Sequence, residues 1–263
     1  MSIKERVLAG EKLDDLGIVD AHMHMNQPPF YVPSSDWESV LVNMDKYGIA
    51  FGLAAPQLAI TCDMVLGNDQ ALEIAGHTER LKAYCSISPH FPDLIGEEME
   101  RCFEKGAVGI KIHPSIHQVN ADDERYDPVY AFAEKHGTIV LAHSWGQSGL
   151  ASPDRFAKAA ERFPKVNILL GHTGGDFAGM RAAIKAIKAR PDNLFADLTG
   201  SMQYLRQVEI LCREVGPRRV VYGSDSPWLE PGQTLGAVFF ADIPDEEKML
   251  ILGGNIKRLL GMD

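Results

Sequence analysis

Two patterns of apolar residues alternate along the chain. Short runs rich in Val, Ile, Leu and Ala predict buried β-strands, and the segments between them carry apolar residues at helical spacing. The predicted strands cover residues 17–19, 50–54, 81–86, 108–112, 138–142, 166–170, 194–197 and 219–222. Because strands that alternate with helices pair in parallel, the pattern predicts an α/β protein built on a parallel sheet.

Start and stop signals support the helices between these strands. One helix follows Asp36, repeats apolar residues on each turn and ends at Gly48, which can take the left-handed conformation of a helix end. A closing helix is expected near residues 249–260, although Gly253 and Gly254 should weaken it.

Length and the positions of polar residues favour a closed sheet over an open one. The chain has 263 residues, close to the about 250 typical of a (β/α)8 barrel. No Gly-x-Gly-x-x-Gly follows the first predicted strand, which argues against a dinucleotide-binding open sheet. Polar residues follow several strands, and in a barrel those strand ends converge on one face. We therefore expect a single-domain (β/α)8 TIM barrel over residues 1–263.

Four histidines and one aspartate lie at these strand ends. His22 and His24 are two positions apart on the first strand, so both rings should point to the same face. His143 and His172 end later strands, and Asp225 ends the last one. We expect a metal site in which His22, His24, His143 and Asp225 are ligands. Zinc suits this set best, with manganese, iron or cobalt as alternatives, and one or two ions could bind.

Two of these residues also suit catalysis. Asp225 can take a proton from metal-activated water, and the structural alternative is an Asx turn before Pro227. His172 could bind a second metal, polarise a substrate carbonyl or carry a proton. The residues after it, 173–176, lead into a helix N-terminus, which would suit an anionic substrate group or serve only as a turn.

Further polar and aromatic residues lie beside this constellation. Lys111 could be a carboxylated bridge between two metals, a cation for a substrate carboxylate, or part of an ion pair at the barrel mouth. His113 could contact substrate or lie on a loop surface. Asp20 could orient a ligand histidine or cap the barrel floor. Trp145 and Trp228 could form an aromatic wall for a flat substrate, or pack between helices.

Composition excludes several classes of protein. The formal net charge is −10 and no basic run offsets it, so no nucleic-acid or anionic-membrane partner is expected. The four cysteines are scattered without a Cys-x-x-Cys pair, and the N-terminus lacks an apolar signal region, so we expect a cytoplasmic protein. No apolar stretch is long enough for a transmembrane helix. The sequence contains no Gly-x-Ser-x-Gly motif, so a serine hydrolase is not expected.

Taken together, several motifs resemble one known family. Asp-x-His-x-His at 20–24, Gly-Ile-Lys-Ile-His-Pro at 109–114, the histidines at 143 and 172, and Gly-Ser-Asp-x-Pro-Trp at 223–228 are similar to motifs of the amidohydrolase superfamily, closest to its "amidohydrolase 2" branch. The resemblance covers essentially the whole chain. It implies a TIM barrel with a mononuclear or binuclear metal site. In mononuclear members the ligands would match His22, His24, His143 and Asp225, with His172 as the catalytic histidine.

The resemblance also sets the functional expectation. The branch contains hydrolases, lactonases of which some work without a metal, and decarboxylases similar to aminocarboxymuconate-semialdehyde decarboxylase. We expect a metal-dependent hydrolase of an amide, lactone or ester bond in a small molecule. The alternative is a non-oxidative decarboxylase of an aromatic or dienoic acid, although the chain is shorter than those enzymes. A non-catalytic ligand-binding barrel is a third hypothesis. Relatives often dimerise, so a homodimer is the implied assembly.

Overall fold

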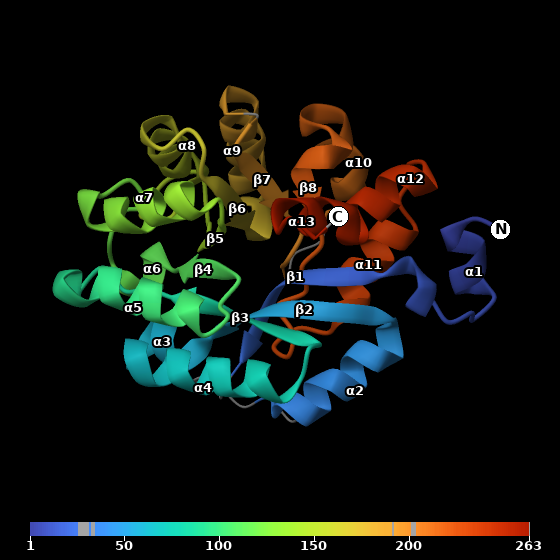
Figure 1. Ribbon diagram of the computed structural model, residues 1–263. Helices are drawn as coiled ribbons and strands as arrows, with labels where there is room; N and C mark the ends of the chain where they lie inside the picture. Colours follow the sequence, from blue (N-terminus) through green and yellow to red (C-terminus); the bar gives the residue numbers. More distant parts are fainter. Residues whose placement is uncertain (26–31, 33–34, 191, 201–203, 263) are drawn as a thin grey trace.

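Eight parallel strands form the centre of the computed structural model, which describes residues 1–25, 32, 35–190, 192–200 and 204–262 (Figure 1). Each strand pairs in parallel with the next along the chain, in the order β1 to β8. The strands are β1 (Ile18–Met25), β2 (Ile49–Pro56), β3 (Leu81–Ser86), β4 (Gly109–Ile112), β5 (Ile139–His143), β6 (Asn167–Gly171), β7 (Leu194–Asp197) and β8 (Val220–Val221). The structure confirms the predicted (β/α)8 TIM barrel.

Helices surround the strands on the outside of the barrel (Figure 1). They are α1 (Ile3–Leu8), α2 (Trp37–Tyr47), α3 (Gln57–Thr61), α4 (Met64–His77), α5 (Pro92–Glu104), α6 (Pro114–His117), α7 (Asp127–His136), α8 (Pro153–Arg162), α9 (Phe177–Ala189), α10 (Gln207–Val215), α11 (Pro231–Phe239), α12 (Asp245–Met249) and α13 (Asn255–Leu259). Within the described residues, no helix combines the length and the apolar character needed to cross a membrane.

The expected closing helix is interrupted rather than continuous. The π-helical segment η5 (Leu250–Gly254) separates α12 from α13. Its wider turn contains the two glycines that were expected to weaken the helix. Gly253 lies so close to β1 that a Cβ there would meet the Gly17 carbonyl oxygen at 2.7 Å. The glycine therefore allows the closing segment to pack directly against the first strand.

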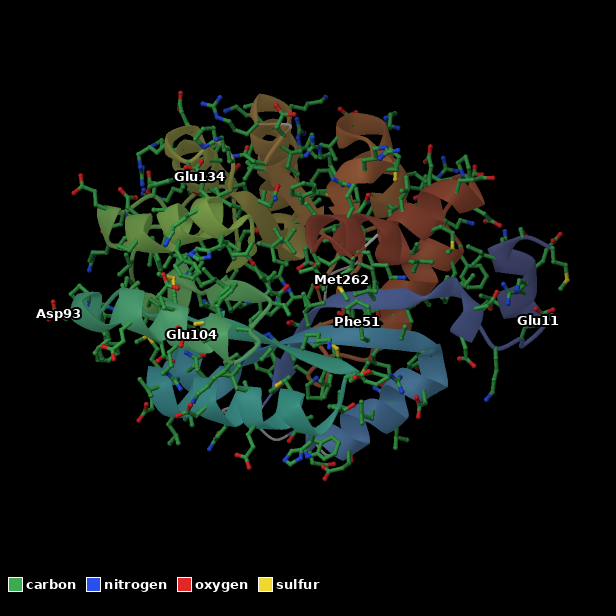
Figure 2. All side chains as sticks on the ribbon, in the orientation of Figure 1. Glu11, Phe51, Asp93, Glu104, Glu134 and Met262 are labelled. Atoms are coloured by element: carbon green, nitrogen blue, oxygen red, sulfur yellow. The ribbon has the colours of Figure 1, made fainter. Side chains whose placement is uncertain are left out.

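The barrel interior has an apolar layer at one end. Leu53, Tyr84, Leu141 and Phe195 belong to an inner buried cluster that also contains Ile256 of α13. The C-terminal helix α13 lies in front of the strands in Figure 1, over this end of the barrel. In Figure 2 the labelled side chain of Phe51 lies near the centre of the same view, whereas the acidic side chains of Glu11 and Asp93 lie at its right and left edges. The other end of the barrel, where the strands finish, is left for polar groups.

Backbone hydrogen bonds between β1 and residues around β8 close the barrel. The Ala21 N–H donates to the Tyr222 carbonyl at 3.0 Å, and the His24 N–H donates to the Ser226 carbonyl at 2.7 Å. The Asp225 N–H donates to the His22 carbonyl at 2.8 Å. This β1–β8 seam places the first and last predicted site residues beside each other.

Candidate metal centre

A bulge in β1 directs His22 and His24 into the barrel mouth. Asp20 pairs with Gly52 and Met23 with Ala54, so β1 has one more residue than β2 between these pairs. An extra residue reverses the inward and outward alternation, and bulges of this kind often re-aim side chains at active sites. The Ala21 carbonyl at the bulge accepts a hydrogen bond from the buried hydroxyl of Tyr84 at 2.8 Å.

Three predicted ligands converge at this point. The Asp225 Oδ1 atom lies 3.1 Å from His24 Nε2 and 3.5 Å from His22 Nε2. All three residues are buried, and each offers a ligand atom within 4.8 Å of the others. The His24 Nδ1 atom is buried and has no hydrogen-bond partner within the described part of the chain. Two imidazoles and a carboxylate converging away from water are a donor set that fits a divalent metal ion.

Asp197 at the end of β7 orients His22. The His22 Nδ1–H donates to Asp197 Oδ2 at 2.6 Å, and both side chains are fully buried. Thr199 fixes the other carboxylate oxygen, because its N–H and its hydroxyl both donate to Asp197 Oδ1, at 3.0 and 2.7 Å. A histidine held in this way presents its second nitrogen to a metal. Burial by itself raises the pKa of Asp197, but the contact with His22 outweighs it, so the pKa lies below its usual value.

Sequence reasoning offered Asp20 for that orienting role and missed Asp197. The Asp20 carboxylate instead accepts hydrogen bonds from the backbone N–H groups of His22 and Ser224, both at 3.1 Å. It therefore supports the backbone at the β1–β8 seam. The signal that could have found Asp197 was its position, since it ends the seventh predicted strand as Asp225 follows the eighth.

Asp225 has an unusual backbone conformation. Its φ of 69° lies in the left-handed region, which a non-glycine residue rarely adopts and which often marks functional sites. Burial raises the pKa of the carboxyl group, but the hydrogen bond from His24 and the nearby His172 and His22 outweigh it. The pKa of Asp225 is therefore held well below its usual value. The carboxylate is ionised at neutral pH.

His143, His172 and His113 lie beside the three converging ligands. His172 is 5.1 Å from His22 and 4.7 Å from His143 between ring centroids. His113 stacks on His143 with centroids 3.9 Å apart. Among the described residues, the group with ligand atoms within 4.8 Å of one another consists of His22, His24 and Asp225, and His143 is not part of it. It faces the same pocket, and its ligand role stays a prediction.

Two tryptophans form walls of this pocket. Trp228 stacks on His24 with centroids 3.7 Å apart, and Trp145 lies parallel to His143 at 5.9 Å. The pocket has a volume of about 180 Å³. It is lined by His24, Lys111, His113, His143, Trp145, His172, Asp225 and Trp228.

Lys111 lies at the floor of the pocket. Its Nζ atom donates to His22 Nε2 at 2.9 Å, and its side chain is almost completely buried. Burial lowers the pKa of the Lys111 ammonium to about 8, while Asp225 and Asp197 act in the opposite direction. Among the described residues, Lys111 forms no ion pair within 4.0 Å. Its roles as a carboxylated bridge or a substrate contact stay predictions.

The helix N-terminus that follows His172 is capped by the chain itself. Asp176 precedes α9, and its Oδ1 atom accepts a hydrogen bond from the Gly179 N–H at 2.6 Å. A carboxylate therefore already occupies the position where an anionic substrate group would bind. The geometry favours the turn alternative for residues 173–176.

Burial keeps four imidazoles of the site, those of His24, His113, His143 and His172, neutral. It lowers the pKa of His24 to about 3 and that of His172 to about 4. It also lowers the pKa of His143 and His113 well below the usual value. Neutral imidazole is the form that binds metal ions. The site therefore presents ligand-competent histidines at neutral pH.

These pKa shifts predict a loss of stability in acid. A histidine has a pKa near 6.5 when unfolded, whereas burial lowers that of His117 and His172 to about 4. Between pH 6.5 and 4 the unfolded chain therefore binds more protons than the native protein does. The free energy of unfolding falls as the pH drops through this range. Each such group contributes about 1.4 kcal/mol per pH unit.

Urea unfolding of metal-free protein between pH 7.5 and 4.5 measures this loss. The matched control is His77→Gln, which changes an exposed histidine outside the site. A free energy of unfolding that stays constant across this range contradicts the buried neutral imidazoles.

A comparison with known families agrees with the site. The family profile described as "Amidohydrolase" matches residues 19–262. The chain therefore belongs to the amidohydrolase family, and the resemblance seen in the sequence is confirmed. It is an enzyme of the amidohydrolase superfamily.

Individual relatives are distant. Dihydroorotase from Mycosarcoma maydis is 24% identical over 202 residues, which cover 68% of this chain and 47% of that protein, so the chain spans about half the length of this relative. The structure is similar to 2,6-dihydroxybenzoate decarboxylase from Rhizobium, with a TM-score of 0.75, 18% identity and coverage of 94% and 99%. It is also similar to a manganese-containing 5-carboxyvanillate decarboxylase from Novosphingobium aromaticivorans, with a TM-score of 0.73, 14% identity and coverage of 95% and 98%. At these identities the structural likeness concerns the fold.

Proposed function

We propose that the protein is a metal-dependent hydrolase that cleaves an amide, lactone or ester bond in a small molecule. The observation that carries this proposal is the buried convergence of His22, His24 and Asp225 beside a pocket. These three residues would hold the ion, with His143 as a further ligand on the pocket wall. A divalent ion there would polarise a carbonyl group and lower the pKa of water from about 15.7 toward 7.

The remaining residues have roles that follow from their charge. Asp225 is ionised and buried, so it can accept a proton from the attacking water and return it to the leaving group. His172 is neutral at pH 7, so it can donate a hydrogen bond to the oxyanion that develops on the carbonyl oxygen. Lys111 would bind a substrate carboxylate or, if carboxylated, bridge two ions.

Metal analysis is the direct test. Protein purified without chelators or a metal-affinity column should contain about one or two equivalents of a divalent ion by plasma mass spectrometry. His22→Ala and Asp225→Ala should lose it, and His77→Ala, which changes an exposed histidine, should retain it. Two equivalents support a bridging Lys111, and one supports a substrate contact. Protein that contains no metal and takes up neither zinc nor manganese contradicts the metal-dependent mechanism and leaves a metal-independent lactonase.

A second candidate function is a non-oxidative decarboxylase. The stacked pair of Trp228 and His24 on one wall and the His113, His143 and Trp145 rings on another favour a flat aromatic acid. Two proteins of similar fold are decarboxylases of such acids by name. A substrate panel decides between the two reactions. Dihydroorotate, a δ-lactone and 4-nitrophenyl acetate test hydrolysis, and 2,6-dihydroxybenzoate and 5-carboxyvanillate test release of CO₂.

A further inference from the structure

His172 stands on a left-handed turn. His172, Thr173, Gly174 and Gly175 have φ values of 64°, 47°, 82° and 75°. Two of these four residues, His172 and Thr173, are not glycine, and positive φ is unfavourable for such residues. A turn of this kind persists only where its surroundings over-determine it.

The ring of His172 depends on that turn for its direction. Within the described residues, the His172 ring makes no hydrogen bond. Its neighbours are the rings of His22, His143 and Trp145 at centroid distances of 5.1, 4.7 and 5.8 Å. The position of the imidazole is therefore set by the backbone beneath it and by packing.

Ser144 connects the two ends of the turn. Its side chain is completely buried. The hydroxyl donates to the Gly171 carbonyl at 2.7 Å and accepts from the Gly174 N–H at 3.0 Å. These two groups lie immediately before His172 and two residues after it. One hydroxyl therefore spans the peptide units on both sides of the histidine.

Other contacts anchor the turn to its neighbours. The Thr173 hydroxyl donates to the Asp197 carbonyl at 2.6 Å, and the Gly146 N–H donates to the Gly174 carbonyl at 2.8 Å. A Cβ on Gly175 would collide with the Trp145 ring. These contacts tie the turn to β7 and to the loop after β5. Among the described residues, only the Ser144 side chain bonds to both sides of His172.

We propose that Ser144 is a positioning residue, whose buried hydroxyl holds the left-handed turn at residues 172–175 and thereby aims the His172 imidazole at the reacting group. This inference rests on the proposed role of His172. Because a misplacement of about 1 Å can lower a rate by about 10²-fold, removing the hydroxyl should lower kcat by about 10-fold or more. The KM and the metal content should change less than about twofold.

The test compares Ser144→Ala with Ser148→Ala, an exposed serine in the same loop. Kinetics use the panel substrate with the largest kcat/KM. A positioning effect must disappear in a His172→Asn background, where Ser144→Ala should cause no further loss. An equal loss in both backgrounds, or an unchanged kcat in Ser144→Ala, overturns the proposal. Ser144→Cys, which retains a weak donor, should lie between wild type and Ser144→Ala, and it replaces Ser144→Ala if that variant does not fold.

A second readout needs no substrate. In protein with ¹⁵N-labelled histidine, Ser144→Ala should shift the ring resonances of His172 and leave those of the distant His90 in place. Unchanged His172 resonances overturn the proposal. If His172→Asn keeps wild-type kcat, the proposed catalytic role of His172 fails, and the resonance shift still decides whether Ser144 positions the ring.

Discussion

Asp225→Asn is expected to lower kcat by about 10³-fold while leaving the fold intact. General acid–base catalysis contributes about 10²–10⁴-fold, and an amide at this position cannot accept the proton. The shape of the side chain is retained, and the backbone bond from the Asp225 N–H to the His22 carbonyl does not depend on the carboxylate. Asparagine also tolerates the left-handed φ of this position.

The measurement is steady-state kinetics on metal-loaded protein, with circular dichroism and metal analysis on the same samples. Asp242→Asn, which alters an exposed aspartate, should retain full activity. Turnover close to that of the wild type in Asp225→Asn would rule out the assigned role of the carboxylate. A loss of turnover explained entirely by lost metal would limit Asp225 to ligation.

Asp197→Asn is expected to weaken metal binding by about 100-fold, the upper end of the range for residues that orient a metal-binding histidine. Thr199 donates its N–H and its hydroxyl to Asp197 Oδ1, so the oxygen of an asparagine would take that place. The amide nitrogen would then face His22 Nδ1 and donate to it. The ring proton of His22 would move to Nε2, which removes the lone pair that a metal needs.

Competition with a chelator measures the affinity, and ¹⁵N resonances of His22 report which nitrogen carries the proton. Asp93→Asn is a suitable control, because Asp93 is exposed at the start of α5. An affinity within about twofold of the wild type would show that Asp197 does not set the tautomer of His22.

The architecture was predictable because it depends on patterns that repeat. All eight predicted strands are present, and in β3 and β7 the predicted bounds agree with the observed ones. The spacing of apolar residues and the polar residues at strand ends can be seen in the sequence itself, because neither depends on contacts between distant parts of the chain. The convergence of His22, His24 and Asp225 followed from the same logic, since parallel strands of a barrel all end at one face.

The details of the site depend on contacts that the sequence does not display. The β1 bulge between Asp20 and Met23 reverses the alternation of side chains, and the apolar pattern of the strand does not reveal it. Asp197 lies 175 positions from His22 and was not singled out. Ser144 belongs to no motif, and the sequence does not show that its hydroxyl lies between the Gly171 carbonyl and the Gly174 N–H.

The β1–β8 seam also governs when the site can come into existence during synthesis. His22 and His24 emerge from the ribosome about two hundred residues before Asp225. Because synthesis proceeds at about 5–20 residues per second, Asp225 is added on the order of 10 to 40 s after the two histidines. An ion that requires all three ligands can be captured only after the last strand has docked against the first. Once bound across the seam, it would join the earliest and latest parts of the barrel and oppose their separation.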